Sequence, residues 1–460
     1  MKYLAYIASL TALASTMQAA DVTIQGKAGR ATITGVTSAD TLILDSSVSP
    51  EYSAGGVTVN KLISTNGAAK GDVNLANIVN FNAGQGITVD ANTASGEFTA
   101  IDVNSWRMNL ATLTVKNSAS ATNATVNVNF GSLLNVNSGG NTQNQYVYFD
   151  SVKANVTASE TTIGNNVDKG SVLGVKSTAD VNWNGNITLG ESGTLDVAGK
   201  FTTSGNLSSK TGSKINLTGT MTTTYASAYV LYSTITSTGK FVQNSSNADA
   251  GITLSKDANM NSGSDWTLQG KLMIQNNSTT TVNEGAYLTF VPNTLNKARV
   301  ILGNGSIVLN QANALRTNAG EPNVSIVTIN TASHVNNIFA NADQELFSLY
   351  VNEATMNIYL DDLVKISLTS ATDATIDYAG SGNLNIFNFQ EDNFYVGTKA
   401  VVKQNVESIV SLYDGNGEYL GAATVNDLGY ITLLTVPEPA EWAAIFGALA
   451  LGLAMYRRRK

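Results

Sequence analysis

The sequence lacks cysteine and has little histidine, arginine, proline or charge. With no cysteine among 460 residues, disulfides, thiolate nucleophiles and cysteine-bound metals are excluded. The one histidine, His334, lies in no recognisable motif, so we interpret it as a loop residue and not as a catalytic base or metal ligand. Charged residues make up 13% of the chain, against about 25% in typical soluble proteins. The composition favours a structural protein over an enzyme.

Short stretches of alternating apolar and polar residues recur along the chain. Val22–Ile24, Ala31–Thr34 and Leu42–Leu44 have this alternation, and Gly, Ser, Asn or Asp bound them, which is typical of half-buried strands. A loose unit, Gly-x-apolar-x-apolar, also recurs. It begins at Gly55, Gly185, Gly193, Gly270, Gly305 and Gly382. Glycine allows a tight corner, and the alternate apolar residues then point into a common interior.

These units predict an all-β fold, a right-handed parallel β-helix over residues 21–340. Rungs of roughly 20 residues and unequal length are compatible with such a stacked solenoid. The strongest local case is Gly185–Thr224, where the separation of Leu195 and Ile215 in the sequence equals one such rung. This composition and succession of short strands resemble those of the passenger regions of autotransporter-type surface proteins. A tandem of β-sandwiches remains the alternative.

The composition changes near residue 340. Between Asn341 and Tyr430 there are 13 acidic residues and three lysines. Residues 341–435 are also richer in aromatic side chains, and we expect them to cap the solenoid or to form a small sandwich. Within them, Leu412–Leu420 predicts a hairpin with a Gly/Asn turn.

Candidate ligand groups in this acidic region are sparse. Asp414, Asn416 and Glu418 alternate oxygen ligands as calcium loops do, but the other loop positions are missing, so a plain turn is the better interpretation. Asp361–Asp362 and Glu391–Asp392 could bind Ca²⁺ or act as glycosidase carboxylates. Adjacent strand residues point to opposite faces, which favours solvated loops. We therefore predict no catalytic residue, metal site or cofactor.

The tryptophans and the basic residues bear on polysaccharide and nucleic acid as ligands. Trp106, Trp183 and Trp266 stand alone in the sequence, so we expect them to be packed in the core and not to form a sugar platform. Nucleic acid is excluded as a partner, because the net charge is −8 and the only basic cluster is at the C-terminus.

The N-terminal residues 1–20 predict an export signal. Lys2 precedes the apolar stretch Tyr3–Leu13, and Gln18 is followed by two small residues, Ala19 and Ala20. We expect the Sec machinery to export the chain and cleavage to follow Ala19 or Ala20.

The C-terminal segment Val436–Lys460 has three parts. Pro437 and Pro439 flank Glu438 and stop any strand or helix from running through. The uncharged run Trp442–Tyr456 follows, about 22 Å long as a helix and short of the ~30 Å hydrocarbon core unless its flanks extend it. The apolar helix residues are Trp442, Ile445, Phe446, Leu449, Leu451, Leu453 and Tyr456. The cytoplasmic anchor comprises Arg457, Arg458, Arg459 and Lys460.

This segment resembles the PEP-CTERM sorting signal of exported proteins from Gram-negative bacteria. The resemblance rests on Pro437, Glu438 and Pro439, the short hydrophobic helix and the terminal arginines. It implies recognition by an exosortase, a membrane transpeptidase-like enzyme, followed by removal of the tail and delivery to the envelope or extracellular matrix. An unprocessed single-helix membrane anchor is the alternative.

The sequence therefore predicts an exported structural or adhesive protein of the cell surface or extracellular matrix, as found in biofilms. An exopolysaccharide is the partner that its Asn, Ser and Thr side chains suit. The alternative is a β-helix polysaccharide lyase or hydrolase. Against it, the body has only four arginines, widely separated: Arg30, Arg107, Arg299 and Arg316.

Overall fold

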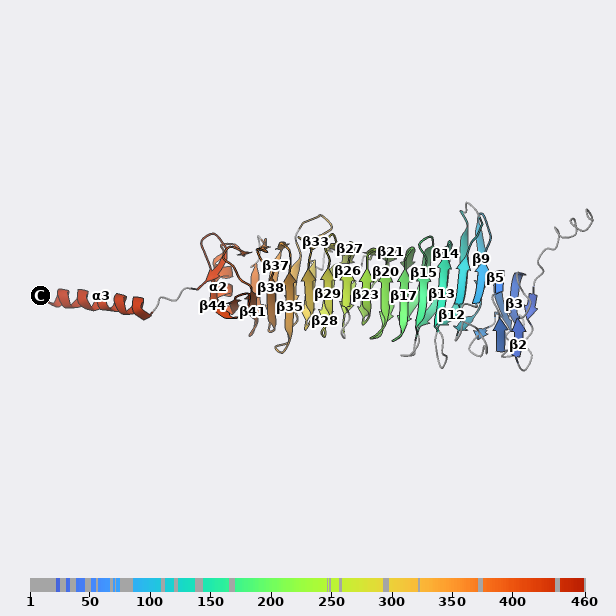
Figure 1. The fold of residues 1–460 in the computed structure, drawn as a ribbon, viewed down its shortest axis with the longest axis horizontal. Coiled ribbons are helices and arrows are strands. Elements are labelled where there is room, and N and C mark those ends of the chain that lie inside the picture. The colour runs from blue at the N-terminus through green and yellow to red at the C-terminus, as the bar shows by residue number, and fades with distance from the viewer. Residues whose placement is uncertain are drawn as a thin grey trace, which may run out of the picture.

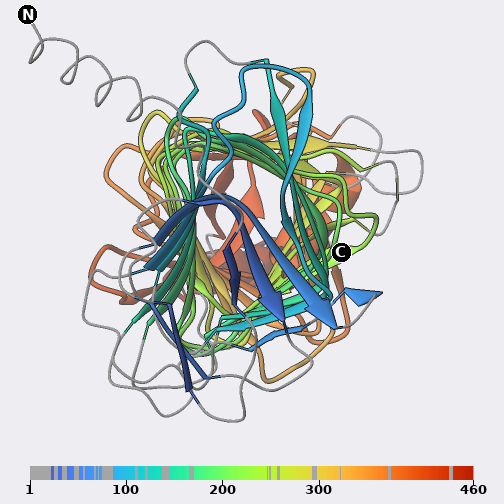
Figure 2. The same cartoon turned by 90° about the vertical axis from the view of Figure 1, so that its right-hand side faces the viewer.

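The fold is a long stack of β-strands, seen along its length in Figure 1 and from one end in Figure 2. It comes from a computed structural model. The model describes residues 22–24, 30–33, 39–45, 51–54, 57–66, 69–70, 72–74, 86–108, 112–119, 123–136, 144–164, 170–245, 247, 250–255, 259–292, 298–321, 323–370, 375–434 and 439–458. Nearly all pairings between strands are parallel, so the predicted mostly-β, solenoid-like fold is confirmed.

Three faces surround the core, and the first is one unbroken parallel ladder. Each strand of this face I pairs with the strand of the next rung. In order they are β5 (Val57–Asn66), β8 (Gly86–Asp90), β11 (Thr112–Lys116), β13 (Gln145–Asp150), β15 (Ser171–Val175), β17 (Gly193–Val197), β20 (Lys214–Leu217), β23 (Thr234–Ser237), β26 (Asn259–Ser262), β29 (Thr279–Val282), β32 (Ser306–Leu309), β35 (Val335–Ala340), β38 (Thr355–Leu360), β41 (Asn383–Phe387) and β43 (Val410–Tyr413).

Face II is a second parallel ladder. Its strands are β9 (Glu97–Asp102), the first halves of β12 (Thr125–Val136), β14 (Lys153–Ile163) and β16 (Asp180–Leu189), then β18 (Lys200–Thr203), β21 (Thr220–Thr223), β24 (Lys240–Gln243), β27 (Trp266–Gln269), β30 (Leu288–Val291) and β33 (Leu315–Thr317). A separate parallel sheet follows, made of β36 (Gln344–Leu346), β39 (Ile366–Leu368) and β42 (Phe394–Tyr395).

Face III completes each rung. It contains β7 (Asp72–Asn74), β10 (Ser105–Met108), the second halves of β12, β14 and β16, and β19 (Leu207–Ser209). A seven-stranded parallel sheet follows: β22 (Ala228–Leu231), β25 (Gly251–Leu254), β28 (Lys271–Gln275), β31 (Arg299–Gly303), β34 (Ser325–Thr328), β37 (Ser348–Asn352) and β40 (Ile376–Ala379). Near the N-terminus lie β1 (Val22–Ile24), β2 (Arg30–Ile33), β3 (Ala39–Asp45), β4 (Glu51–Ala54) and β6 (Ala69–Lys70).

The register places apolar side chains of successive rungs above one another. Leu195, Ile215 and Ile235 are successive partners on face I, so one rung there spans the separation of Leu195 and Ile215, as predicted. Ile307 pairs with Ile338, which makes that rung longer than the one between Leu195 and Ile215. Extra residues therefore enter the loops, while the inward residues stay aligned and form one continuous core.

The predicted Gly-x-apolar-x-apolar unit marks the corners of this core. Both apolar residues are fully buried in the five units whose side chains are described: Ile187 and Leu189, Leu195 and Val197, Leu272 and Ile274, Ile307 and Leu309, and Leu384 and Ile386. Gly185 has φ +136° and lies opposite a bulge in β14, where a Cβ would overlap the Ala158 carbonyl oxygen. Gly193 keeps an ordinary φ, but the Ile163 carbonyl oxygen also lies where its Cβ would stand.

The C-terminal end of the stack is covered by a helix and two antiparallel strands (Figure 1). α2 (Ala400–Ile409) buries Val402, Val406 and Ile409 against the last rungs, and Asn405 Nδ2 donates 2.8 Å to the Ile376 carbonyl oxygen. This helix is a correction to the all-β expectation. β44 (Tyr419–Val425) pairs antiparallel with β43 and with β45 (Ile431–Leu433), which confirms the predicted hairpin. Across residue 340 the ladder continues, because Leu309, Ala340 and Leu360 are successive partners.

Replacing Gly185 by alanine tests the corner geometry. We expect Gly185→Ala to lower the free energy of unfolding by about 2 kcal/mol, because the new Cβ meets a backbone oxygen at a φ that side chains rarely adopt. Gly170→Ala is the control, since its added Cβ would stand 3.5 Å from the nearest atom, Asn144 Oδ1. Urea titrations of both variants measure the difference. Equal stabilities would contradict the role of Gly185.

Candidate functional site

The C-terminal tail forms the predicted helix. α3 (Pro439–Arg458) begins at Pro439, a position where the missing proline N–H leaves no helical bond unmade. The rest of the predicted sorting motif, Pro437 and Glu438, lies outside the described residues, as do Arg459 and Lys460. The predicted signal cleavage site at Ala19 and Ala20 also lies outside them.

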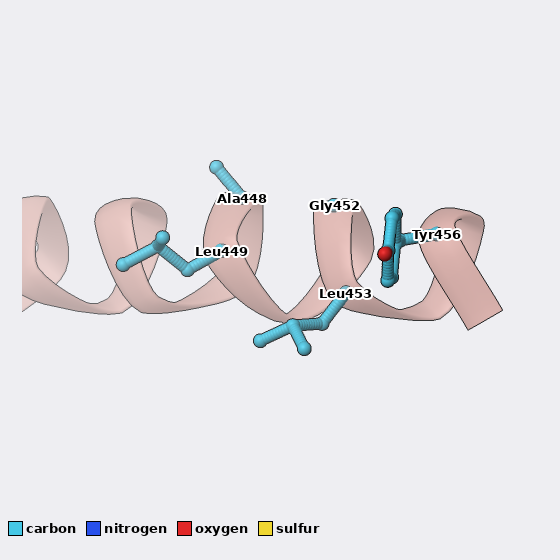
Figure 3. A pocket seen from close by; sticks show the side chains of 5 residues that line it. All are labelled: Ala448, Leu449, Gly452, Leu453 and Tyr456. Carbon is cyan, nitrogen blue, oxygen red and sulfur yellow. The ribbon is translucent and has the colours of Figure 1, made fainter.

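The described apolar side chains of α3 are exposed. Leu449, Leu451, Leu453 and Met455 are each 58–64% exposed, and Arg457 is exposed beyond them. Figure 3 shows an open hollow beside Ala448, Leu449, Gly452, Leu453 and Tyr456, which is the surface of a single helix and not an enclosed site. The helix expected over Trp442–Tyr456 thus forms within α3. No helix in the described part of the chain is long and apolar enough to cross a membrane.

Candidate catalytic and metal-binding side chains lie mainly in turns. His334 is in the turn before β35, as predicted, and its backbone N–H donates to the Thr331 carbonyl oxygen at 3.0 Å. Asp361–Asp362 and Glu391–Asp392 are exposed in two turns, also as predicted. Among the described residues, no three His, Cys, Asp or Glu side chains gather closely enough to hold a metal ion.

The tryptophans are core residues, which confirms the prediction. Trp106, Trp183 and Trp266 are each at most 2% exposed. Trp183 lies between Phe149 and Phe201, with ring centroids 6.1 and 6.2 Å away. None of the three offers a face to a sugar.

A different set of aromatic residues lies on the outside of face I near its C-terminal end. Phe339, Tyr359, Phe387 and Tyr413 occupy the same position on β35, β38, β41 and β43. Their rings stack with centroids 4.8, 4.6 and 4.6 Å apart and planes within 19° of parallel. We call these four residues the aromatic stack. They are half-buried, and Tyr419 closes the stack edge-on, 5.5 Å from Tyr413.

An amide ladder runs beside the aromatic stack, two positions earlier on each strand. Asn357 Nδ2 donates to Asn337 Oδ1 at 3.1 Å, and Asn385 Nδ2 donates to Asn357 Oδ1 at 2.9 Å. Each amide also has a second donor and acceptor. The stack and the ladder together give this part of face I a strip of ring edges bordered by aligned amides.

A groove of about 450 Å³ opens where the aromatic stack meets the turns that follow β38, β41 and β43. Its lining includes two rings, Tyr359 and Phe387, two carboxylates, Asp362 and Asp414, and two amides, Asn388 and Asn416. Asn388 Nδ2 donates to Asp362 Oδ1 and to the Leu360 carbonyl oxygen, both at 3.1 Å. The Asn388 N–H donates to the Asp414 carbonyl oxygen at 3.2 Å, so three successive rungs are joined at this wall.

Asp414 holds the floor of the groove through its own turn. Its Oδ1 accepts the N–H groups of Glu418 at 2.8 Å and Asn416 at 2.9 Å. The Glu418 N–H, with the Asn416 bonds, holds the pKa of Asp414 below its ordinary value. The interpretation of Asp414, Asn416 and Glu418 as a hairpin turn is therefore confirmed.

The aromatic stack and the groove were not predicted, although a signal for them is present in the sequence. The stretches 337–339, 357–359 and 385–387 read Asn-Ile-Phe, Asn-Ile-Tyr and Asn-Ile-Phe, and 411–413 reads Ser-Leu-Tyr. In a parallel stack, such a repeat places like side chains on adjacent rungs. The number of aromatic residues in a segment does not show which of them occupy equivalent positions on adjacent strands, so that number alone does not predict this alignment.

Comparisons with known proteins give no guide to this surface or to the tail. No protein-family model, curated protein or solved structure matches the chain.

Acid should loosen the turn that carries Asp414. Because its folded-state pKa is lowered, its stabilising contribution is complete above the unfolded value of about 3.9 and is lost as the pH falls through the folded value. We expect the protection factors of the amides in residues 411–422, which are exchange rates corrected for the intrinsic pH dependence of exchange, to fall at low pH in the native protein. In Asp414→Asn, the protection factors should be lower at neutral pH and should depend less on pH.

The matched control is Asp392→Asn, which changes an exposed carboxylate in another turn. It should keep the native pH dependence of the protection factors in residues 411–422. An unchanged pH dependence in Asp414→Asn would contradict the role assigned to that carboxylate.

Proposed function

We propose that the protein is an exported structural or adhesive component of the cell surface or extracellular matrix, sorted through its C-terminal tail. The observation that carries the proposal is the unbroken ladder of face I, with a separate helix, α3, beyond its capped end. Fourteen parallel steps lead from β5 to β43. At roughly 4.8 Å per step this makes a rod of about 67 Å.

The form of the body suits a spacer or adhesive better than a catalyst. A solenoid separates its two ends by a distance set by the number of rungs, and it offers a long, repetitive surface for many weak contacts. Its winding, which we propose to be right-handed, makes each rung a repeat of the one before. The outer faces present Asn, Ser and Thr side chains, which suit the hydroxyl groups of an exopolysaccharide.

In this proposal the C-terminal tail determines where the protein is delivered. After export by the Sec machinery, α3 and its cationic end would hold the precursor at the membrane. An exosortase-like enzyme would then act near Pro437–Pro439 and release the body to the surface or matrix. The exposed apolar surface of α3 supports this division, since the body buries none of Leu449, Leu451 or Leu453.

The alternative of a polysaccharide lyase or hydrolase has weaker support. A hydrolase needs one carboxyl group that is protonated at working pH, together with a second carboxylate. Asp414 is held ionised by its turn, which makes it a poor proton donor. Arg316 is 3.5 Å from Asp265 and lies over the Tyr287 ring, so its charge is engaged away from the groove.

The intact mass of the protein from its native cells tests the sorting proposal. We expect the native C-terminus near Pro437, with the hydrophobic segment missing. The double variant Pro437→Ala, Pro439→Ala should keep its C-terminus at Lys460, because the motif read by the processing enzyme is gone. Pro292→Ala, a proline outside the tail, should be processed normally. A native C-terminus at Lys460 would refute processing and leave an uncleaved tail.

A further inference from the structure

We propose that the groove beside the aromatic stack binds an oligosaccharide that carries protonated amino groups, such as a chain of glucosamine units. This proposal rests on the proposed function as a matrix protein and names the class of its ligand. It concerns the wall formed by Tyr359, Phe387, Asp362, Asn388 and Asp414.

The lining combines the two kinds of surface that a sugar ring presents. A pyranose has apolar C–H groups on its faces and polar groups around its rim. Tyr359 and Phe387 supply their apolar ring edges, because neighbouring rings of the aromatic stack cover their faces. Asp362, Asn388 and Asn416 supply hydrogen-bonding atoms within the same groove. A carboxylate accepts about four hydrogen bonds, so Asp362 can still accept bonds from a ligand after accepting the one from Asn388.

The charge of the lining selects among sugars. Two carboxylates line the groove, and none of the described lining residues is Lys, Arg or His. The surrounding segment is acidic as well, with 13 acidic residues against three lysines from Asn341 to Tyr430. An ammonium group is therefore attracted and a uronate is repelled, and a neutral sugar gains only the uncharged contacts.

The groove is also held in shape before any ligand arrives. The turn at Asp414 is fixed by N–H groups from Asn416 and Glu418. Asn388 is fixed by its bonds to Leu360 and Asp362 on the preceding rung. Walls ordered by backbone bonds lose little conformational entropy on binding, which favours a specific site over a merely sticky surface.

The amide ladder extends the same surface along the rod. Asn337, Asn357 and Asn385 lie on three consecutive rungs next to the aromatic stack, about 4.8 Å apart. A sugar chain that runs from the groove along the rod would meet the more exposed amides of Asn385 and Asn337, whereas Asn357 between them is buried. The site is thus suited to a polymer and not to a single sugar.

Titration calorimetry on the purified full chain tests this proposal with three probes of equal length. They are a glucosamine oligosaccharide, a neutral glucose oligosaccharide and a galacturonate oligosaccharide. We expect the affinity to fall in that order, with the galacturonate unbound. Added salt should weaken glucosamine binding, because the charges at the groove are partly exposed.

Substitutions of residues that line the groove test whether the sugar binds there. Asp362→Asn preserves the shape of the side chain and an acceptor for Asn388, and we expect it to weaken glucosamine binding about tenfold. Asp392→Asn removes one charge outside the groove and should bind as the native protein does. Tyr359→Leu should also weaken binding, whereas Tyr146→Leu, which alters the stacked pair Tyr146 and Tyr148 on β13, should not. Melting curves check that each variant folds.

Three results would overturn the proposal: no binding of the glucosamine probe, equal binding of all three probes, or equal loss in Asp362→Asn and Asp392→Asn. Release of shortened sugars during the titration would also overturn it, in favour of a hydrolase. None of these outcomes bears on where the tail is cut. The intact mass and the binding data can therefore fail independently.

Discussion

The structure depends on the register between successive rungs. Side chains of a strand alternate between the core and the outside, so a slip of one position would turn every inward residue outward. The core has neither disulfides nor cysteine-bound metals to fix this register, because the chain lacks cysteine. Burial of aligned apolar columns, such as Leu195, Ile215 and Ile235, fixes it instead. Loop length is then free to vary, so one stack accommodates rungs of unequal length.

A stack of parallel strands also needs a cap on its last strand. The last parallel strand, β43, would otherwise expose a row of unpaired N–H and C=O groups that could pair with another chain. Here β44 covers that edge in the antiparallel sense, and α2 covers the end of the core. The turn at Asp414, which forms the floor of the groove, is also the turn that reverses the chain into β44. Termination of the fold and formation of the groove thus involve the same residues.

The sequence predicts much of the architecture and little of the site. Alternation within short stretches, and glycine before two apolar residues, were enough for a mostly-β stack and for the pairing of Leu195 with Ile215. α2 was missed because so short a segment holds only a brief helical pattern, Val402, Val406 and Ile409, among polar neighbours. The groove joins residues 359, 387 and 414, which become neighbours only once the rung lengths between them are known. Those lengths are set by loops, whose residues carry no periodic signal.

The direction of the hydrogen bonds gives the rod a mechanical polarity. Bonds between rungs run along the axis of the stack, so a pull along the chain at the C-terminal end acts on a few bonds at a time and peels strands in sequence. A pull at the C-terminal end reaches β45 and β44 first and then β43, the last strand of the parallel ladder. The antiparallel strands β44 and β45 therefore yield first, before the rungs behind them. How firmly the rod resists a pull at its C-terminal end is decided by this small antiparallel region and not by the long core.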